Sequence, residues 1–171
     1  AELNSCFIAF DDIMEKYNLE KIKTIGDAYM CAGGIPIPDP NHYWNMVKAA
    51  KDIQTTIHMR NREREAKGLP PWEIRIGIHV GPIVAGVVGK KKYAYDIWGS
   101  TVNIASRMES NGEPGQINIS SATYDLIKDE YACTHRGKIY AKNVGDIDMY
   151  FLGDKIKKEE VVKENMPILV G

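Results

Sequence analysis

The sequence lacks the features that mark disulfide-rich, zinc-binding, membrane-spanning and secreted proteins. Only three cysteines occur among 171 residues, and none forms a Cys-x-x-Cys pair, which argues against a disulfide framework or a zinc site and fits a reducing compartment. No apolar run approaches the roughly 18 residues of a membrane span. The chain opens on an amphipathic pattern rather than a basic region, so no signal peptide is expected. We therefore expect a cytoplasmic domain, whose parent protein could still be anchored to a membrane.

An excess of one charge is also missing. Lysine and arginine number 22, and aspartate and glutamate number 23. A sheet that binds single-stranded RNA needs exposed aromatic side chains on adjacent strands and a basic surface, and neither is evident in this sequence. We therefore expect no nucleic-acid partner. The length is sufficient for one α/β domain with its own core.

Apolar periodicity predicts helices mixed with strands. Helices are expected over the first 17 residues, from Asn41 as N-cap to about residue 67, from Ser100 as cap to about Asn111, and over Ala122–Ile127. The expected strands are Leu19–Ile25, Ala28–Gly34, Glu73–Gly81, the apolar run Pro82–Gly89, Tyr93–Trp98, Gln116–Ser120, Tyr131–Ala141 and Ile147–Leu152. This order favours an α+β fold in which helices cover a mixed sheet. The domain is expected to span residues 1–153, and the charged residues 154–171 are expected to be a tail or linker.

Asp27 follows Gly26 at the join of the first two predicted strands. A carboxylate held at a tight turn and open on one side is well placed for a magnesium ion. The alternative is that Gly-Asp is simply a turn sequence. The residue alone does not decide between these two interpretations.

The segment from Asp96 to Arg107 carries the strongest chemical signal. Asn103 and Arg107 are four residues apart and therefore lie on one helix face, just after a helix N-terminus. An amide and a guanidinium in this position suit a sugar-phosphate. The alternative is a capped helix whose Asn and Arg make only local bonds. Lys91, within a run of three lysines, and Lys142 are candidate phosphate contacts, although each alone would be interpreted as a surface lysine.

Three segments carry a family resemblance: KIKTIGDAYM at Lys21–Met30, IRIGIHVGPIVAGVVG at Ile74–Gly89 and YDIWGSTVNIASRM at Tyr95–Met108. With these motifs the sequence resembles the catalytic domain of class III nucleotidyl cyclases, the adenylyl and guanylyl cyclases. The resemblance implies a ferredoxin-like βαββαβ core, a head-to-tail homodimer or a paired cyclase domain, and two sites at the interface. It also implies two Mg²⁺ or Mn²⁺ ions per site and an upstream sensor or regulatory domain in the parent protein.

The resemblance also implies a role for each candidate residue. Asp27 matches a metal-binding carboxylate, Asn103 the asparagine that orients the ribose, and Arg107 the arginine on the α-phosphate. The remaining positions would bind substrate: Lys23, Asp96 and Ile97 at the base, and Lys142 and Lys91 at the terminal phosphates. One chain of the dimer would supply the metal carboxylates, and the other would supply the base, ribose and α-phosphate contacts.

Lys23 and Asp96 bear on which base is bound. Adenine presents an acceptor at N1 and a donor at its 6-amino group, which a lysine and an aspartate match; guanine reverses this edge. Similar guanylyl cyclases place an acidic and a small residue at these positions. The resemblance therefore implies an adenylate cyclase that converts ATP to cyclic AMP and pyrophosphate.

One family feature is not found in the sequence. The family has an earlier strand and loop with a first metal aspartate, in a pattern like D-I-x-G-F-T, and no such pattern occurs here. The resemblance places it upstream of Ala1. Two alternatives therefore stay open besides an adenylate cyclase: a guanylate cyclase, and a catalytically silent domain that binds nucleotide or regulates a partner.

Overall fold

The computed structural model of the chain describes residues 1–90 and 94–157. Within these ranges it contains four helices and eight strands, which confirms the predicted α+β class. The helices are α1 (Glu2–Lys16), α2 (His42–Ala66), α3 (Ser100–Ser110) and α4 (Ser121–Ile127). The strands are β1 (Glu20–Ile25), β2 (Ala28–Ala32), β3 (Ile76–Ile78), β4 (Val84–Val88), β5 (Ala94–Trp98), β6 (Ile117–Ser120), β7 (Tyr131–Ala141) and β8 (Gly145–Lys155).

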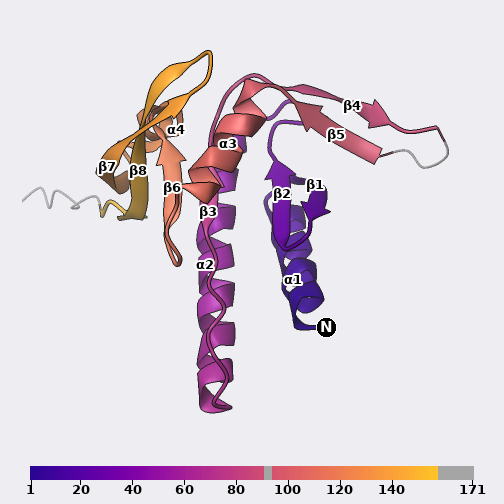
Figure 1. Cartoon of the computed structure of the whole chain (residues 1–171), viewed down its shortest axis with the longest axis vertical. Helices are drawn as coiled ribbons and strands as arrows, with labels where there is room; N and C mark the ends of the chain where they lie inside the picture. The colour runs from indigo at the N-terminus through magenta and orange to yellow at the C-terminus, as the bar shows by residue number, and fades with distance from the viewer. Residues whose placement is uncertain (91–93, 158–171) are drawn as a thin grey trace, which may run out of the picture.

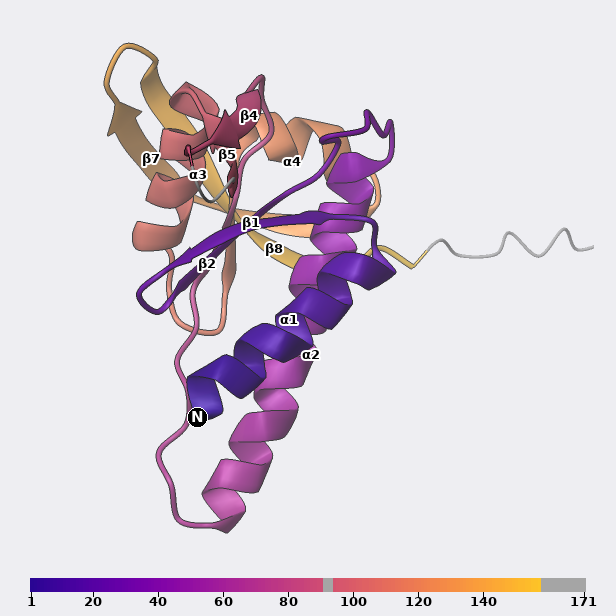
Figure 2. The same ribbon diagram turned by 90° about the vertical axis from the view of Figure 1, so that its right-hand side faces the viewer.

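Helices α1 and α2 pack against each other and form one part of the core (Figures 1 and 2). Phe10 and Met14 of α1 are one turn apart and lie in one cluster with Ala49, Ile53 and Ile57 of α2. Full burial of such an apolar side chain contributes about 1.5–3 kcal/mol. The predicted amphipathic pattern of both helices is therefore confirmed.

The largest sheet contains four strands in the order β3-β6-β8-β7. Strand β3 is parallel to β6, and the other two pairs are antiparallel. Ile117 and Ile119 of β6 are fully buried in a cluster with Val47 and Ala50 of α2. On the other side of the sheet, a separate cluster joins α3 to β7 and β8 through Ile104, Met108, Ala141, Ile147 and Met149. Helices α2 and α3 therefore cover opposite faces.

Two antiparallel hairpins lie outside this sheet. The predicted β1–β2 hairpin is confirmed, and it turns at Gly26-Asp27. Strands β4 and β5 form an arm that extends away from the rest of the molecule (Figure 1). Val84 and Val87 on this arm are 67% and 63% exposed, so the apolar pattern of the arm is not explained by contacts within the chain.

In the part of the chain that the structure describes, the strands therefore form three separate sheets. Strand β2 pairs only with β1, and β3 pairs only with β6. Tyr29 and Cys31 of β2 nevertheless pack on the same α1–α2 cluster as Ile76 of β3. Each of the two strands has one hydrogen-bonding edge that no described strand occupies.

The structure corrects three local predictions. The strand expected over Glu73–Gly81 is limited to Ile76–Ile78, because its partner β6 offers only a short length for pairing. Asn41 is the N-cap residue of α2, as predicted, but its side chain makes no hydrogen bond to the helix end. The helix α3 begins at Ser100, and its N-cap is Gly99, with a φ of 127°.

The closing hairpin is confirmed and is longer than predicted. Strand β8 continues two residues beyond Gly153, to Lys155. Residues 158–171 lie outside the described ranges, so the predicted division between domain and tail stays a prediction.

Candidate active site

The β1–β2 hairpin carries two of the predicted site residues, Lys23 and Asp27. Gly26 has a φ of 59°, a left-handed conformation that glycine adopts without steric cost, so the chain reverses direction at this point. Asp27 follows it in the turn and is exposed. Its carboxylate is therefore open to a ligand or to a second chain.

Strand β5 brings Asp96 next to Lys23, although the two residues are 73 positions apart in the sequence. Lys23 Nζ donates to Asp96 Oδ2 over 2.9 Å, and the backbone N–H of Ile97 donates to Asp96 Oδ1 over 2.8 Å. The hydrogen bond from Lys23, aided by the one from Ile97, lowers the pKa of Asp96. Ile97 itself is buried, at 7% exposure, and holds the strand in place.

The aspartate therefore stays ionised at neutral pH and keeps acceptor capacity. A carboxylate offers about four lone-pair positions, and these two bonds use only part of them. The Asp96 side chain is 15% exposed and that of Lys23 is 43% exposed. Both side chains are therefore accessible to a ligand in the folded protein.

Helix α3 places Asn103 and Arg107 on one exposed face, as predicted. Thr101 fixes the start of the helix, since its Oγ1 donates to the carbonyl of Pro82 over 2.6 Å. Arg107 Nη1 donates to the carbonyl of Tyr140 over 2.8 Å, at the end of β7. Lys142 is exposed two residues further on, in the turn between β7 and β8. The chain thus brings Arg107 close to the turn that carries Lys142.

The described contacts define two groups of predicted residues. Lys23, Asp96 and Ile97 are joined directly by hydrogen bonds, and Arg107 is joined to the strand that leads to Lys142. Only Gly99 separates β5 from α3, so the two groups are adjacent along the chain. In the described ranges, no side-chain hydrogen bond or ion pair joins Asp27 to either group. Lys91 lies outside the described residues.

Backbone groups are the part of this site that sequence reasoning missed. The carbonyl of Tyr140 orients Arg107. This contact cannot be predicted from the sequence, because every residue has a backbone carbonyl.

Asp27 fits one ligand position of a divalent metal site, since hard cations prefer carboxylate oxygens. Among residues 1–90 and 94–157, however, no three His, Cys, Asp or Glu side chains come together to hold an ion. The described residues of one chain therefore do not form a complete metal site.

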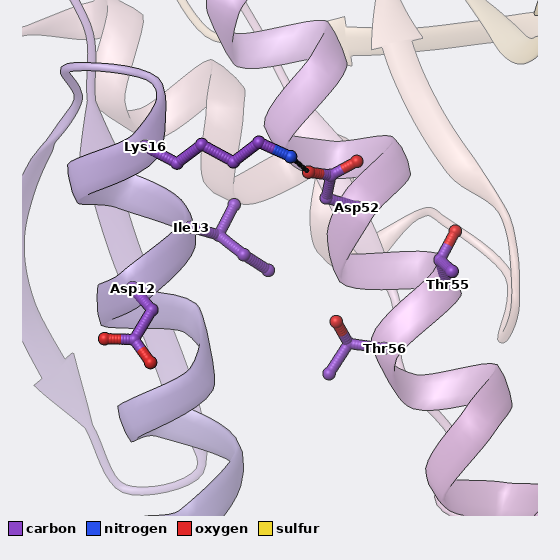
Figure 3. Close-up of a pocket in the computed structure, with 6 residues that line it drawn as sticks. All are labelled: Asp12, Ile13, Lys16, Asp52, Thr55 and Thr56. Atoms are coloured by element: carbon purple, nitrogen blue, oxygen red, sulfur yellow. Dashed lines mark hydrogen bonds and ion pairs between the residues drawn. The ribbon is translucent and has the colours of Figure 1, made fainter.

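A hollow lies elsewhere, between α1 and α2. It has a volume of about 370 Å³ and is lined by Asp12, Ile13, Lys16, Asp52, Thr55 and Thr56 (Figure 3). Lys16 spans it with an ion pair to Asp52 over 2.9 Å. None of the predicted site residues lines it.

The family profile of the adenylate and guanylate cyclase catalytic domain matches residues 1–154. The chain belongs to this family. An adenylate cyclase of Mycobacterium bovis is 37% identical over 155 residues, covering 90% of this chain and 34% of that protein. The soluble guanylate cyclase subunit beta-2 of Rattus norvegicus is 37% identical over 159 residues, covering 92% of this chain and 23% of that protein. The chain thus spans about a third or less of these relatives' length.

A solved cyclase structure supports the same fold. The adenylyl cyclase CyaB from P. aeruginosa superposes with a TM-score of 0.82 at 31% identity, covering 89% of this chain and 80% of that one. As a member of the cyclase family, the chain has relatives of both base specificities, so family membership alone does not decide between ATP and GTP. None of its described helices is long and apolar enough to cross a membrane.

Proposed function

We propose that the chain is the catalytic domain of an adenylate cyclase, which converts ATP to cyclic AMP and pyrophosphate. The observation that carries this proposal is the Lys23–Asp96 pair, whose side chains meet over 2.9 Å. Lysine donates to N1 of adenine, and aspartate accepts from the 6-amino group. Guanine would present a donor to the lysine and an acceptor to the aspartate. Each such mismatch of a desolvated polar group costs about 1–3 kcal/mol.

The other residues act on the sugar and the phosphates. Asn103 orients the ribose so that its 3′-oxygen attacks the α-phosphorus; the new bond is O3′–P, and the bond to the pyrophosphate oxygen breaks. Arg107 donates to the α-phosphoryl oxygens, where negative charge builds up during the reaction. It therefore stabilises the transition state more than the bound substrate. Lys142 and Lys91 neutralise the terminal phosphates as they leave.

Two Mg²⁺ or Mn²⁺ ions would complete the site, with Asp27 as one ligand. When bound, such ions lower the pKa of the 3′-hydroxyl and neutralise the triphosphate. The remaining carboxylate is expected from the upstream strand that the family resemblance implies. Asp27 and the base and ribose residues would come from different chains.

The site would therefore lie between two head-to-tail copies, or between this domain and a paired cyclase domain. The exposed arm supports this arrangement: Val84, Val87 and Trp98 are 67%, 63% and 41% exposed, and burial against a second chain would remove that apolar area from water. We place the domain in the cytoplasm, where its three free cysteines, Cys6, Cys31 and Cys133, would stay reduced. The chain matches only 34% and 23% of the length of two relatives, which is consistent with a sensor or regulatory domain elsewhere in the parent protein.

Turnover of ATP and GTP by the full-length protein tests the proposal. Each nucleotide is supplied at the same concentration with Mg²⁺ or Mn²⁺, and the cyclic product is separated by chromatography. We expect cyclic AMP to form at least about tenfold faster than cyclic GMP, because two base contacts are mismatched with GTP. Comparable rates, or a preference for GTP, would support the guanylate cyclase alternative. Nucleotide binding without any cyclic product would support the silent domain.

A further inference from the structure

Helix α3 carries both Asn103 and Arg107, so its position on the sheet decides where these side chains point. The helix packs directly on β3: a Cβ built on Gly77 would lie 2.1 Å from the backbone nitrogen of Glu109. The rest of the contact is apolar, with Ile104 and Met108 against Met149. Apolar contacts fix the distance between the helix and the sheet. Because they are non-directional, they do not define the position of the helix along the sheet.

Asn118 supplies a directional contact near the C-terminal end of α3, as Thr101 does at its start. It lies on β6 between Ile117 and Ile119, which face the α2 side of the sheet, and it is completely buried on the α3 side. Its Nδ2 donates to the carbonyl of Met108 over 2.9 Å. Met108 belongs to the last turn of α3, where helix carbonyls have no partner within the helix. Met108 directly follows Arg107 in the chain, so the bond is one residue away from the backbone of Arg107.

The same amide is poorly suited to stabilising the fold. Its Oδ1 is buried and has no hydrogen-bond partner among residues 1–90 and 94–157, and an unpaired buried acceptor opposes folding. The gain from one bond is therefore offset by the cost of the unpaired oxygen. The hydrogen bond of Asn118 instead selects one position of the helix along the sheet, since it can form only at that position.

Two arginines donate to the same helix end from the surface. Arg75 Nη1 reaches the carbonyl of Ser110 over 3.3 Å, and Arg136 Nη1 reaches that of Asn111 over 2.5 Å. Cations at a helix C-terminus are favourable, and these two hold the end of α3 from either side of the buried amide. Asn118 is the one of the three donors that is shielded from water.

We propose that Asn118 is a positioning residue for the cyclase reaction: its bond to Met108 sets α3 along the sheet and so aims Arg107 at the α-phosphate. This inference rests on the proposed function. The inference predicts that replacing Asn118 lowers the rate of turnover without a matching loss of folding stability.

The test replaces Asn118 by Leu in the full-length protein, because leucine has a similar volume and removes both the donor and the unpaired acceptor. We expect the melting temperature to change little and kcat for ATP to fall about tenfold or more, with a smaller change in KM. The matched control is Ile117→Val, on the same strand but facing α2. It should lower the melting temperature by about 2–4 °C and leave kcat unchanged.

A double-mutant cycle separates positioning from general damage. In an Arg107→Ala background, Asn118→Leu should lower the residual rate less than about twofold, because the group it aims is gone. An equal tenfold loss in both backgrounds, or a loss of kcat matched by a large fall in melting temperature, would overturn the inference. If Arg107→Ala alone leaves turnover intact, the proposed function fails instead, whatever Asn118→Leu does.

Discussion

At the scale of single residues, the Lys23–Asp96 ion pair is the strongest link between this structure and a chemical function. The hydrogen bond from Lys23 lowers the pKa of Asp96, so the contribution of the pair to stability is present above the unfolded-state pKa of about 3.9. That contribution is lost as the pH falls through the lower, folded-state value. At neutral pH the aspartate is therefore an acceptor only, which suits the 6-amino group of adenine.

The pKa of Asp96 can be measured without any turnover. Lys23→Met removes the hydrogen bond that is the main cause of the lowering, so the pKa of Asp96 should rise toward its ordinary value. Titration of the carboxyl carbon by NMR measures it. Lys21→Met, which removes the neighbouring lysine that pairs with Asp11, is the matched control and should leave the Asp96 titration unchanged. An unchanged pKa in Lys23→Met would mean that the pair is not formed in solution.

The same two residues should control the base. Lys23→Glu combined with Asp96→Cys removes the adenine contacts and offers an acceptor to the N1–H of guanine. We expect the ratio of kcat/KM for GTP over ATP to rise about tenfold or more in the full-length protein. Lys21→Glu serves as the control for added negative charge on β1. A wild-type protein that already uses both nucleotides at similar rates would rule out the adenine assignment.

The sequence could predict which residues share a helix face, but it could not predict contacts between distant segments. Asn103 and Arg107 could be placed on one face because helical spacing is a local property. The Lys23–Asp96 contact joins residues 73 positions apart, and only the family resemblance suggested it. The unpaired oxygen of Asn118 could not be predicted at all, because burial of a polar side chain depends on packing between distant elements.

At the scale of elements, local patterns succeeded where pairing was local. The β1–β2 hairpin and the β7–β8 hairpin join neighbouring segments, and both were predicted. The strand expected over Glu73–Gly81 was too long, because alternating isoleucines reveal a strand pattern but not the length of its partner. The apolar run in Pro82–Gly89 indicated a strand, and the structure places it in an arm whose valines are exposed.

This arm is the element that we expect to hold two copies together. Val87→Glu places a charge on an exposed strand position of the arm, where it would be buried in the dimer, so it should shift the protein toward monomers. Sedimentation velocity over a range of concentrations measures the shift. Met59→Glu, at another exposed apolar position on α2, should leave the association unchanged. Dimers that persist in Val87→Glu would place the interface elsewhere.

At the scale of the whole molecule, the domain is expected to need more than these 171 residues. One carboxylate cannot hold two divalent ions in the geometry of an in-line displacement, and the described residues form no metal cluster. We expect the 171-residue chain to turn over ATP orders of magnitude more slowly than the full-length protein, when both are assayed at equal concentration. Equal rates would mean that another carboxylate in this sequence completes the metal site.

The shared site between two chains is tested most directly by mixing two inactive variants. Asp27→Ala and Arg107→Ala should each reduce cyclic AMP formation in the full-length protein to a small residual rate. Mixed and allowed to exchange subunits, they should recover about a quarter of the wild-type rate, because half of the dimers are mixed and each of these has one intact site. Asn103→Ala mixed with Arg107→Ala should recover nothing, because both residues belong to the same side of the site. No recovery for the first mixture, with mixed dimers shown to form, would contradict a site shared between chains.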